Sequence, residues 1–189
     1  MIQLDQNFKD HSFIDINEKW FGEAFSVIAK LKTQLNDPQK SIKVQNAVGN
    51  RSTPNGIRSL FFAAFGKANN LESKIGDEYK GLYLFGEPVA DGRFKPAYVG
   101  ISRTMIRRFR GHTIMQGSNN ASWTFLMAKK DHPEIDNKEF EMRYRSDFQK
   151  KIWPCNFTMV PIENDFEMHI LEGMAACVLK AKWNSFSTH

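Results

Sequence analysis

The sequence predicts an α+β fold in which a small mixed or antiparallel β-sheet is flanked by helices. Two β-rich runs, residues 81–85 and 96–102, are joined by a connection rich in Gly, Pro and Asp, which is typical of a hairpin. Helical patterns lie on both sides of this pair, in residues 17–36 and after residue 102. With 189 residues, of which 41% are hydrophobic, the chain is long enough to bury a sizeable core.

The N-terminal elements are predicted to be mainly helical. An apolar stripe along residues 17–36, with Asn17 as candidate cap, consists of Trp20, Ala24, Ile28 and Leu31. Turn-forming residues occupy 45–57, and the sequence after them favours another short helix. We therefore assign residues 1–75 to a helical extension that serves packing, DNA contact or dimerisation.

Residues 76–189 are predicted to form the sheet-containing domain. After the hairpin, Ser102 is a candidate cap for a helix whose apolar side holds Met105, Ile106 and Phe109. Because Arg108 and His112 are four residues apart, they share another side of that helix. This places a cationic helix directly behind a strand that carries Tyr98.

The elements after this helix follow from the same patterns. Residues 122–130 favour a short helix, and residues 137–152 a further one, because Phe140, Tyr144 and Phe148 repeat every four positions. Residues 155–164 are β-like. Asn164, followed three residues later by Glu167, resembles a capping box at the start of a last helix. The charged segment near 131–155 is interpreted as an insertion that carries target recognition or a dimer contact.

Positive charge is segregated along the chain. The formal net charge is +5, and no carboxylate occurs between residues 92 and 130 or between 38 and 71. Such segregation is typical of surfaces that bind the phosphates of nucleic acids, although a basic helix is more often only a solvated face. The candidate nucleic-acid-binding residues are Lys95, Arg103, Arg107, Arg110, Lys129 and Lys130.

Targeting and cysteine signals are weak. The first ten residues have neither the basic region nor the apolar core of a signal peptide, and the longest apolar run, residues 60–65, is too short to span a bilayer. Two cysteines, Cys155 and Cys177, suggest neither a disulfide framework nor a zinc site. We expect a cytoplasmic protein without a membrane segment.

The tripeptides "GLY" at 81–83 and "YVG" at 98–100 resemble the pair that names the GIY-YIG nuclease superfamily. In that family an arginine follows the second tyrosine by ten positions and a histidine by about fourteen, and these positions hold Arg108 and His112. A glutamate and, after a hydrophobic interval, an asparagine complete the family pattern, and Glu172 and Asn184 match them. The resemblance covers roughly residues 79–185 and implies a GIY-YIG-like fold and endonuclease activity.

Two residues would handle charge at the phosphodiester. Arg108 has a planar fork of donors that matches phosphate geometry, so it would bind the scissile phosphate. Glu172 would hold one Mg²⁺ or Mn²⁺, because hard cations prefer carboxylate oxygen and a single carboxylate leaves positions for water and phosphate. An unpaired carboxylate on the apolar helix around Glu172 is expensive, which also calls for a metal or a partner.

The remaining residues would manage protons and geometry. The resemblance implies that Tyr83 is the general base, although an unperturbed phenol with a pKa near 10 is only about one part in a thousand ionised at pH 7. His112 is the alternative base, or a second residue that positions phosphate and water. Tyr98 would orient this network, and Asn184 would fix Glu172 or the local backbone. Taken alone, each strand tyrosine is more often a packing residue.

The resulting hypothesis is a metal-dependent DNA endonuclease, with a restriction or defence role favoured over a repair or homing role because the nuclease unit fills most of the chain. The alternative is a nucleic-acid-binding protein that keeps this fold without catalysis. A structural domain that binds no nucleic acid is a third class, and it would leave the acid-free windows unexplained. RNA stays an alternative substrate. A homodimer is a further alternative, with Trp20, Phe21 and Phe25 as candidate contacts, although core packing explains them equally well.

Overall fold

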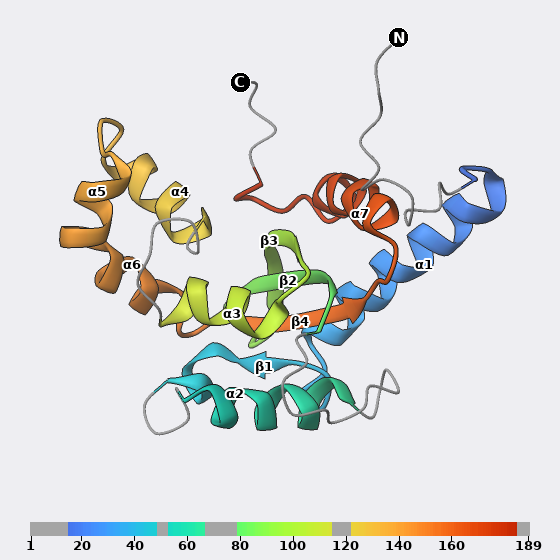
Figure 1. Cartoon of the computed structure of the whole chain (residues 1–189), viewed down its shortest axis with the longest axis horizontal. Helices are drawn as coiled ribbons and strands as arrows, with labels where there is room; N and C mark the ends of the chain where they lie inside the picture. The colour runs from blue at the N-terminus through green and yellow to red at the C-terminus, as the bar shows by residue number, and fades with distance from the viewer. Residues whose placement is uncertain (1–14, 49–52, 67–78, 115–121, 185–189) are drawn as a thin grey trace, which may run out of the picture.

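The computed structural model describes residues 15–48, 53–66, 79–114 and 122–184. Within these ranges, one antiparallel sheet is formed by β1 (Ile42–Lys43), β4 (Asn156–Pro161), β2 (Gly81–Pro88) and β3 (Phe94–Ser102), in that spatial order. Helices surround the sheet, and β2 and β4 are its central strands (Figure 1). The predicted α+β class is confirmed, and the sheet is antiparallel throughout.

The predicted hairpin is present and longer than expected. Both strands extend toward the turn, because β2 continues to Pro88 and β3 begins at Phe94. The register places Phe85 opposite Tyr98 but Gly86 opposite Pro96, so Ala97 is an extra residue in β3. Such a bulge bends a strand and changes the direction of its side chains. Here the bulge immediately precedes Tyr98.

The N-terminal segment is integrated with the sheet. Helix α1 (Glu18–Leu35) begins at Asn17, whose side chain accepts a hydrogen bond from Trp20 N, and its predicted apolar stripe is buried. Strand β1 pairs with β4, and a 3₁₀ turn, η2 (Val44–Ala47), follows it. Helix α2 (Pro54–Phe61) continues as a π-helical turn, η4 (Phe62–Gly66). The described part of residues 1–75 therefore covers both faces of the sheet and adds a strand to it.

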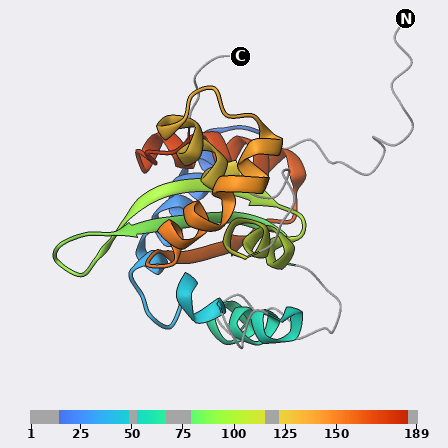
Figure 2. The same ribbon diagram turned by 90° about the vertical axis from the view of Figure 1, so that its left-hand side faces the viewer.

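Alternating strand residues build a core on each face of the sheet. Leu82, Leu84 and Val99 pack with α1 and with α7 (Asp165–Val178). Tyr83 and Phe85 point to the opposite face, where they join an aromatic core with residues of α2 and of α3 (Met105–Thr113). Figure 2 shows the sheet between α7 on one side and α2 on the other. The predicted site tyrosines thus face the aromatic core.

The helix-rich segment after the hairpin holds one correction. Ser102 does not cap α3: Thr104 is the capping position, and the Ser102 hydroxyl accepts a hydrogen bond from Thr104 N at 3.0 Å. The side chain of Thr104 makes no capping hydrogen bond either. The first turn of α3 is instead tied to the start of β2 by Met105 N, which donates to Tyr79 O at 2.8 Å.

The segment around 131–155, together with the helix before it, forms a small helical unit of residues 122–152. It begins with α4 (Ser122–Asp131), continues with a single turn, α5 (Asn137–Glu139), and ends with a π-helical turn, η7 (Phe140–Tyr144), that leads into α6 (Arg145–Ile152). Its core is formed by Ala128, Ile135, Phe140 and Phe148. The helix predicted for 137–152 is confirmed over the same residues, with a π-helical turn in its middle, and the unit packs against α3.

Gly81 fixes the start of β2 because no other residue fits there. Its φ is +155°, and a Cβ at this position would lie 2.2 Å from the carbonyl oxygen of Val160 in the neighbouring strand. A contact that short with backbone cannot be relieved by a side-chain rotation. The first glycine of the "GLY" tripeptide is therefore required by the close pairing of β2 with β4.

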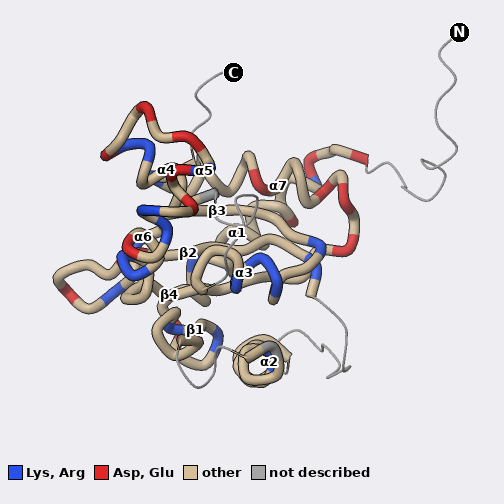
Figure 3. Tube along the Cα trace, turned by 60° about the vertical axis from the view of Figure 1, so that its left-hand side comes forward, with Lys and Arg blue, Asp and Glu red and all other residues tan. Residues whose placement is uncertain are grey.

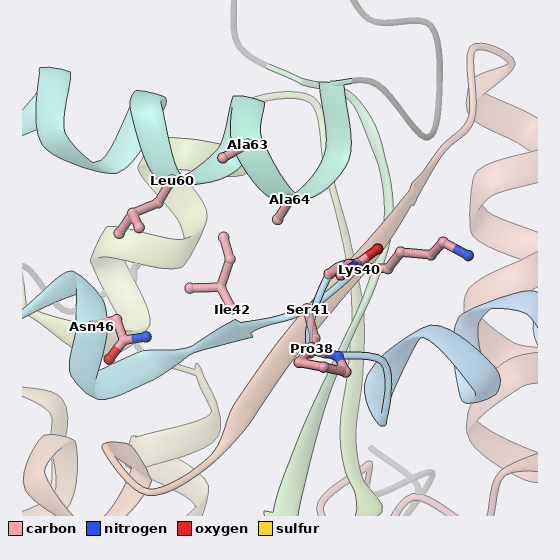
Figure 4. A pocket seen from close by; sticks show the side chains of 9 residues that line it. Pro38, Lys40, Ser41, Ile42, Asn46, Leu60, Ala63 and Ala64 are labelled. Atoms are coloured by element: carbon pink, nitrogen blue, oxygen red, sulfur yellow. The ribbon is translucent and has the colours of Figure 1, made fainter.

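A cavity of about 610 Å³ lies at the β1 edge of the sheet. Ser41 and Ile42 line one side, and Leu60, Ala63 and Ala64 of the helix above line the other (Figure 4). None of the predicted site residues lines this cavity. The Tyr83 side chain instead extends from the central strand β2.

Candidate active site at the β2–β3 hairpin

The Tyr83 hydroxyl is the meeting point of two side chains from α3. It lies 3.0 Å from His112 Nε2 and accepts a hydrogen bond from Arg108 Nε, also at 3.0 Å. The tyrosine is completely buried, in the centre of β2. Three of the predicted site residues therefore form one hydrogen-bonded cluster.

Gly100 makes room for this cluster. It lies opposite Tyr83 in the β2–β3 register, and the phenol ring crosses over it. A Cβ on Gly100 would lie 2.3 Å from the Tyr83 hydroxyl oxygen and 2.5 Å from the ring carbon that bears it. The last glycine of the "YVG" tripeptide is thus the residue over which the Tyr83 phenol lies.

The rotation of α3 brings Arg108 and His112 to the same phenol. Met105 and Phe109 are buried in the aromatic core, so the helix has one fixed orientation over the sheet. Residues four apart lie on one side of a helix, as predicted from the spacing. His112 is fully buried, and its ring packs edge-on against Phe85 at a centroid distance of 5.4 Å.

Tyr98 lines the same cluster from β3. Its ring stacks on Trp123 of α4 at 5.9 Å with an interplanar angle of 3°, and meets the His112 ring at 5.5 Å. Its ring centroid lies 6.2 Å from that of Tyr83. Both tyrosines also act electrostatically on Arg108: burial lowers the pKa of the guanidinium, but the two phenols outweigh it and raise that pKa.

Burial keeps the central pair neutral. It raises the pKa of Tyr83 well above its usual value, and Tyr98 and Glu172 raise it further, while Arg108 opposes them. Burial lowers the pKa of His112 well below its usual value, and the positive charges of Arg108 and Arg145 add to this effect. At neutral pH the cluster therefore holds a neutral phenol against a neutral imidazole.

Glu172 approaches the cluster from α7. Its side chain is half-buried, and burial raises the pKa of the carboxyl, while His169, Arg108 and the backbone N–H of Ile101 oppose this. Its charge is close enough to act on the pKa of Tyr83. In the described part of the chain, no group of three or more His, Cys, Asp or Glu side chains gathers as a metal site. Glu172 therefore interacts with Tyr83 and with Arg108 through its charge.

Asn184 does not join the ring of phenol, guanidinium and imidazole. Its side chain binds both backbone groups of Val99: Val99 N donates to Oδ1 at 2.7 Å, and Nδ2 donates to Val99 O at 2.8 Å. Trp183 N donates to the carbonyl of the bulge residue Ala97 at 2.9 Å. Together they pair with the outer edge of β3 and hold the strand that carries Tyr98 and Gly100.

The basic residues near the site differ in their surroundings. Basic positions follow α3, whereas acidic positions are spread over α7 and the α4–α5 connection (Figure 3). Arg103 is bound to Asp165 at the start of α7, which also pairs with Lys80 at 2.7 Å. The acid-free window in the sequence is therefore not acid-free in space, because Asp165 neutralises one of these two cations.

The other candidate nucleic-acid contacts are distributed over several elements. Arg107 is exposed and Arg110 half-buried on α3, and Lys95 is exposed on β3 opposite Glu87. On α4, Lys129 lies over the Phe125 ring and Lys130 over the Trp183 ring. Arg107 and Arg110 are thus the members of this set that lie on the same helix as Arg108.

Arg145 is the residue that the sequence interpretation missed. It is buried, and its Nη2 donates to Gly111 O in the last turn of α3 at 2.9 Å. Its charge also lowers the pKa of His112. The available signal was the spacing of Arg145, Gln149 and Trp153, three hydrogen-bond donors that recur every four residues in a segment interpreted as a charged outer face.

Comparison with family models, curated proteins and solved structures finds no match to this chain. The resemblance to GIY-YIG nucleases therefore rests on the residue pattern, and the geometry of the site is read from this chain alone. Among the described residues, no helix is long and apolar enough to cross a bilayer.

Proposed function

We propose that the chain is a metal-dependent endonuclease of the GIY-YIG type that hydrolyses phosphodiester bonds in DNA. The observation that carries this proposal is the cluster in which the Tyr83 hydroxyl meets Arg108 Nε and His112 Nε2, each at 3.0 Å, with Glu172 close by. These are the residue types that phosphodiester hydrolysis needs: a base, a cation for the phosphate and a carboxylate for a metal.

Arg108 is the proposed phosphate ligand. A guanidinium carries five N–H donors; Nε donates to Tyr83 and the Tyr98 phenol also interacts with the guanidinium, so a phosphate would bind the terminal N–H groups beside these two phenols. A phosphate bound by these groups would lie beside the Tyr83 oxygen. The arginine would then stabilise the negative charge that develops on the phosphoryl oxygens as water attacks.

Tyr83 and His112 are proposed to act together as the general base. Since Arg108 Nε–H already donates to the phenol oxygen, the phenol hydrogen is available to His112 Nε2, which accepts it in the neutral tautomer that carries its proton on Nδ1. The attacking water would pass a proton to Tyr83 while Tyr83 passes its own to His112. The raised pKa of Tyr83 and the lowered pKa of His112 oppose this transfer. The bound substrate must therefore supply the driving force.

Glu172 fits a Mg²⁺ or Mn²⁺ ion that keeps most of its coordination for water and phosphate oxygens. Its half-buried carboxyl has a pKa raised by burial, a cost that a divalent cation would offset. When bound, the ion would stabilise negative charge on the leaving oxygen. Tyr98, stacked on Trp123, would form a wall beside the bound phosphate.

A catalytically inactive nucleic-acid-binding protein is the second candidate. Complete burial of Tyr83 favours it, because a buried phenol with a raised pKa is a poor base until water reaches it. This protein would bind DNA with strong salt dependence and leave the strands intact.

The test is cleavage of supercoiled DNA by the purified chain in Mg²⁺, Mn²⁺ or EDTA, with Glu172→Gln beside the wild type. Glu167→Gln is a matched control, because Glu167 is also a half-buried glutamate of α7 but lies outside the cluster. We expect cleavage only with a divalent cation, its loss in Glu172→Gln, retained DNA binding in that variant, and normal cleavage by Glu167→Gln. Binding without scission by the wild type would move the assignment to the second candidate.

A further inference from the structure

Side chains of α6 hold the carbonyl end of α3. Gly111 O accepts hydrogen bonds from Arg145 Nη2 at 2.9 Å and from Gln149 Nε2 at 3.5 Å. Thr113 O accepts one from Trp153 Nε1 at 3.4 Å. The three donors recur every four residues, so they lie along one side of α6 and its last turn.

These bonds satisfy groups that a helix cannot satisfy itself. The last four carbonyls of an α-helix have no partner within the helix, and Gly111 and Thr113 lie in the last turn of α3. The negative end of the helix dipole also favours a cation there, which Arg145 provides. The contact is therefore specific in both geometry and charge.

Arg145 is fixed in this position by a second interaction. Its Nη1 pairs with Glu141, one turn earlier, and the two side chains are only 3% and 20% exposed. Removal of one member of a buried pair is expensive, because the other keeps an uncompensated charge. The guanidinium thus joins the helical unit of residues 122–152 to a single carbonyl of α3.

We propose that Arg145 is a positioning residue for the candidate active site: through Gly111 it holds the turn of α3 that places His112 against Tyr83. His112 lies between the two carbonyls that α6 holds, and its ring nitrogen is 3.0 Å from the phenol. In this account the helical unit acts on the chemistry of the site without touching the substrate. The catalytic part of the inference rests on the proposed nuclease function, and the structural part does not.

The titratable and charged groups that face His112 come from four elements. They are Tyr83 of β2, Tyr98 of β3, Arg108 of α3 itself and Arg145 of α6. Arg108 and Arg145 both disfavour the imidazolium, so loss of Arg145 removes one of two neighbouring positive charges. The pKa of His112 is expected to rise in Arg145→Met, because both the charge and the fixed position of the ring are lost.

The test compares Arg145→Met with Arg143→Met in the full chain. Arg143 also pairs with a glutamate four residues earlier, Glu139 at 3.0 Å, but it is 67% exposed, so it controls for the loss of an arginine in the same segment. The pH titration of the His112 ring is followed by NMR, with the signal assigned from His112→Gln. We expect an altered ring signal and a higher pKa in Arg145→Met, and the wild-type titration in Arg143→Met.

Activity gives a second readout. We expect Arg145→Met to lower kcat about 10- to 100-fold, the size of effect that a displaced catalytic group produces, with little change in KM for DNA. Arg145→Lys keeps the charge and one donor, so it should restore part of the rate. A folded Arg145→Met with wild-type His112 titration and wild-type kcat would overturn the proposal.

Two outcomes call for a comparison other than the cleavage rate of Arg145→Met. If Arg145→Met does not fold, Arg145→Gln and Gln149→Leu carry the same comparison, because the first removes the charge of Arg145 and each weakens the hydrogen bonds to Gly111. If the wild type cuts no DNA, the nuclease proposal fails while the His112 titration still decides whether α6 positions the ring. An unchanged titration in both of these variants would also overturn the positioning role.

Discussion

Gly100→Ala is the smallest change that tests the geometry of the site. The added Cβ would lie 2.3 Å from the Tyr83 hydroxyl oxygen, whereas ordinary contacts begin at 3.4 Å, so the phenol and β3 must separate by about 1 Å. The phenol cannot yield cheaply, because it is fully buried and bonded to Arg108 and His112. We expect a loss of about 1–3 kcal/mol in the free energy of unfolding, which is typical of overpacking.

The same displacement acts on the proposed chemistry. A shift of about 1 Å in a reacting group can cost about 100-fold in rate, so cleavage should fall far more than DNA binding. Cleavage is measured on supercoiled DNA, and stability by urea unfolding. Gly22→Ala is the control, because no atom beyond the adjoining residues and backbone of its own helix lies within 4 Å of a Cβ at that position, and alanine there should preserve activity and add up to about 1 kcal/mol of stability. Wild-type cleavage and stability in Gly100→Ala would refute this account of the Tyr83 environment.

Three further predictions concern other parts of the account. The cleavage rate of the wild type should stay nearly level from about pH 7 to pH 9, because the proposed relay starts from a neutral Tyr83, whose pKa is raised, and a neutral His112, whose pKa is lowered; a tenfold rise per pH unit would show that Tyr83 must ionise before the step. Asn184→Leu should cost about 1–3 kcal/mol in urea unfolding, because it leaves an N–H and a carbonyl of β3 unpaired; a neutral effect would show that β3 does not need this partner. The hydrogen bonds from Arg103 and Lys80 hold the pKa of Asp165 well below its ordinary value. The ionised Asp165 therefore stabilises the fold above the unfolded-state pKa of about 4, and this stabilisation is lost as the pH falls from there toward the lower folded-state pKa. The free energy of unfolding of Asp165→Asn should therefore fall less between neutral and acid pH than that of the wild type. Identical acid-unfolding curves for the two proteins would contradict this prediction.

Local patterns in the sequence predicted the parts of the site that depend on local geometry. The four-residue spacing of Arg108 and His112 places them on one side of a helix, and the apolar residues Met105 and Phe109 settle which side faces the sheet. Alternation along β2 directs Tyr83 toward that helix. The convergence of Tyr83, Arg108 and His112 therefore follows from the alternation of side chains along β2, the helical spacing along α3 and the short connection between β3 and α3.

The local sequence patterns could not predict contacts between segments that are distant in the chain. Strand β1 has two residues, too few for a periodic signal, and pairs with a strand more than a hundred positions later. The pairing of Asp165 with Arg103 joins the start of α7 to the end of β3, so an acid-free window in the sequence did not predict the charge around it. Arg145 reaches α3 through the packing of α6, which a helix pattern alone does not specify.

The measurement that tests the central claim most directly is single-turnover cleavage of bound DNA in Mg²⁺ by Tyr83→Phe and by the wild type. Phenylalanine keeps the ring that packs in the aromatic core and removes only the hydroxyl that meets Arg108 and His112. The account predicts a folded variant that binds DNA as the wild type does and cleaves at least about 100-fold more slowly, the range expected when a general base is removed. Cleavage at the wild-type rate would contradict it, because the site would then work without the group on which its residues converge.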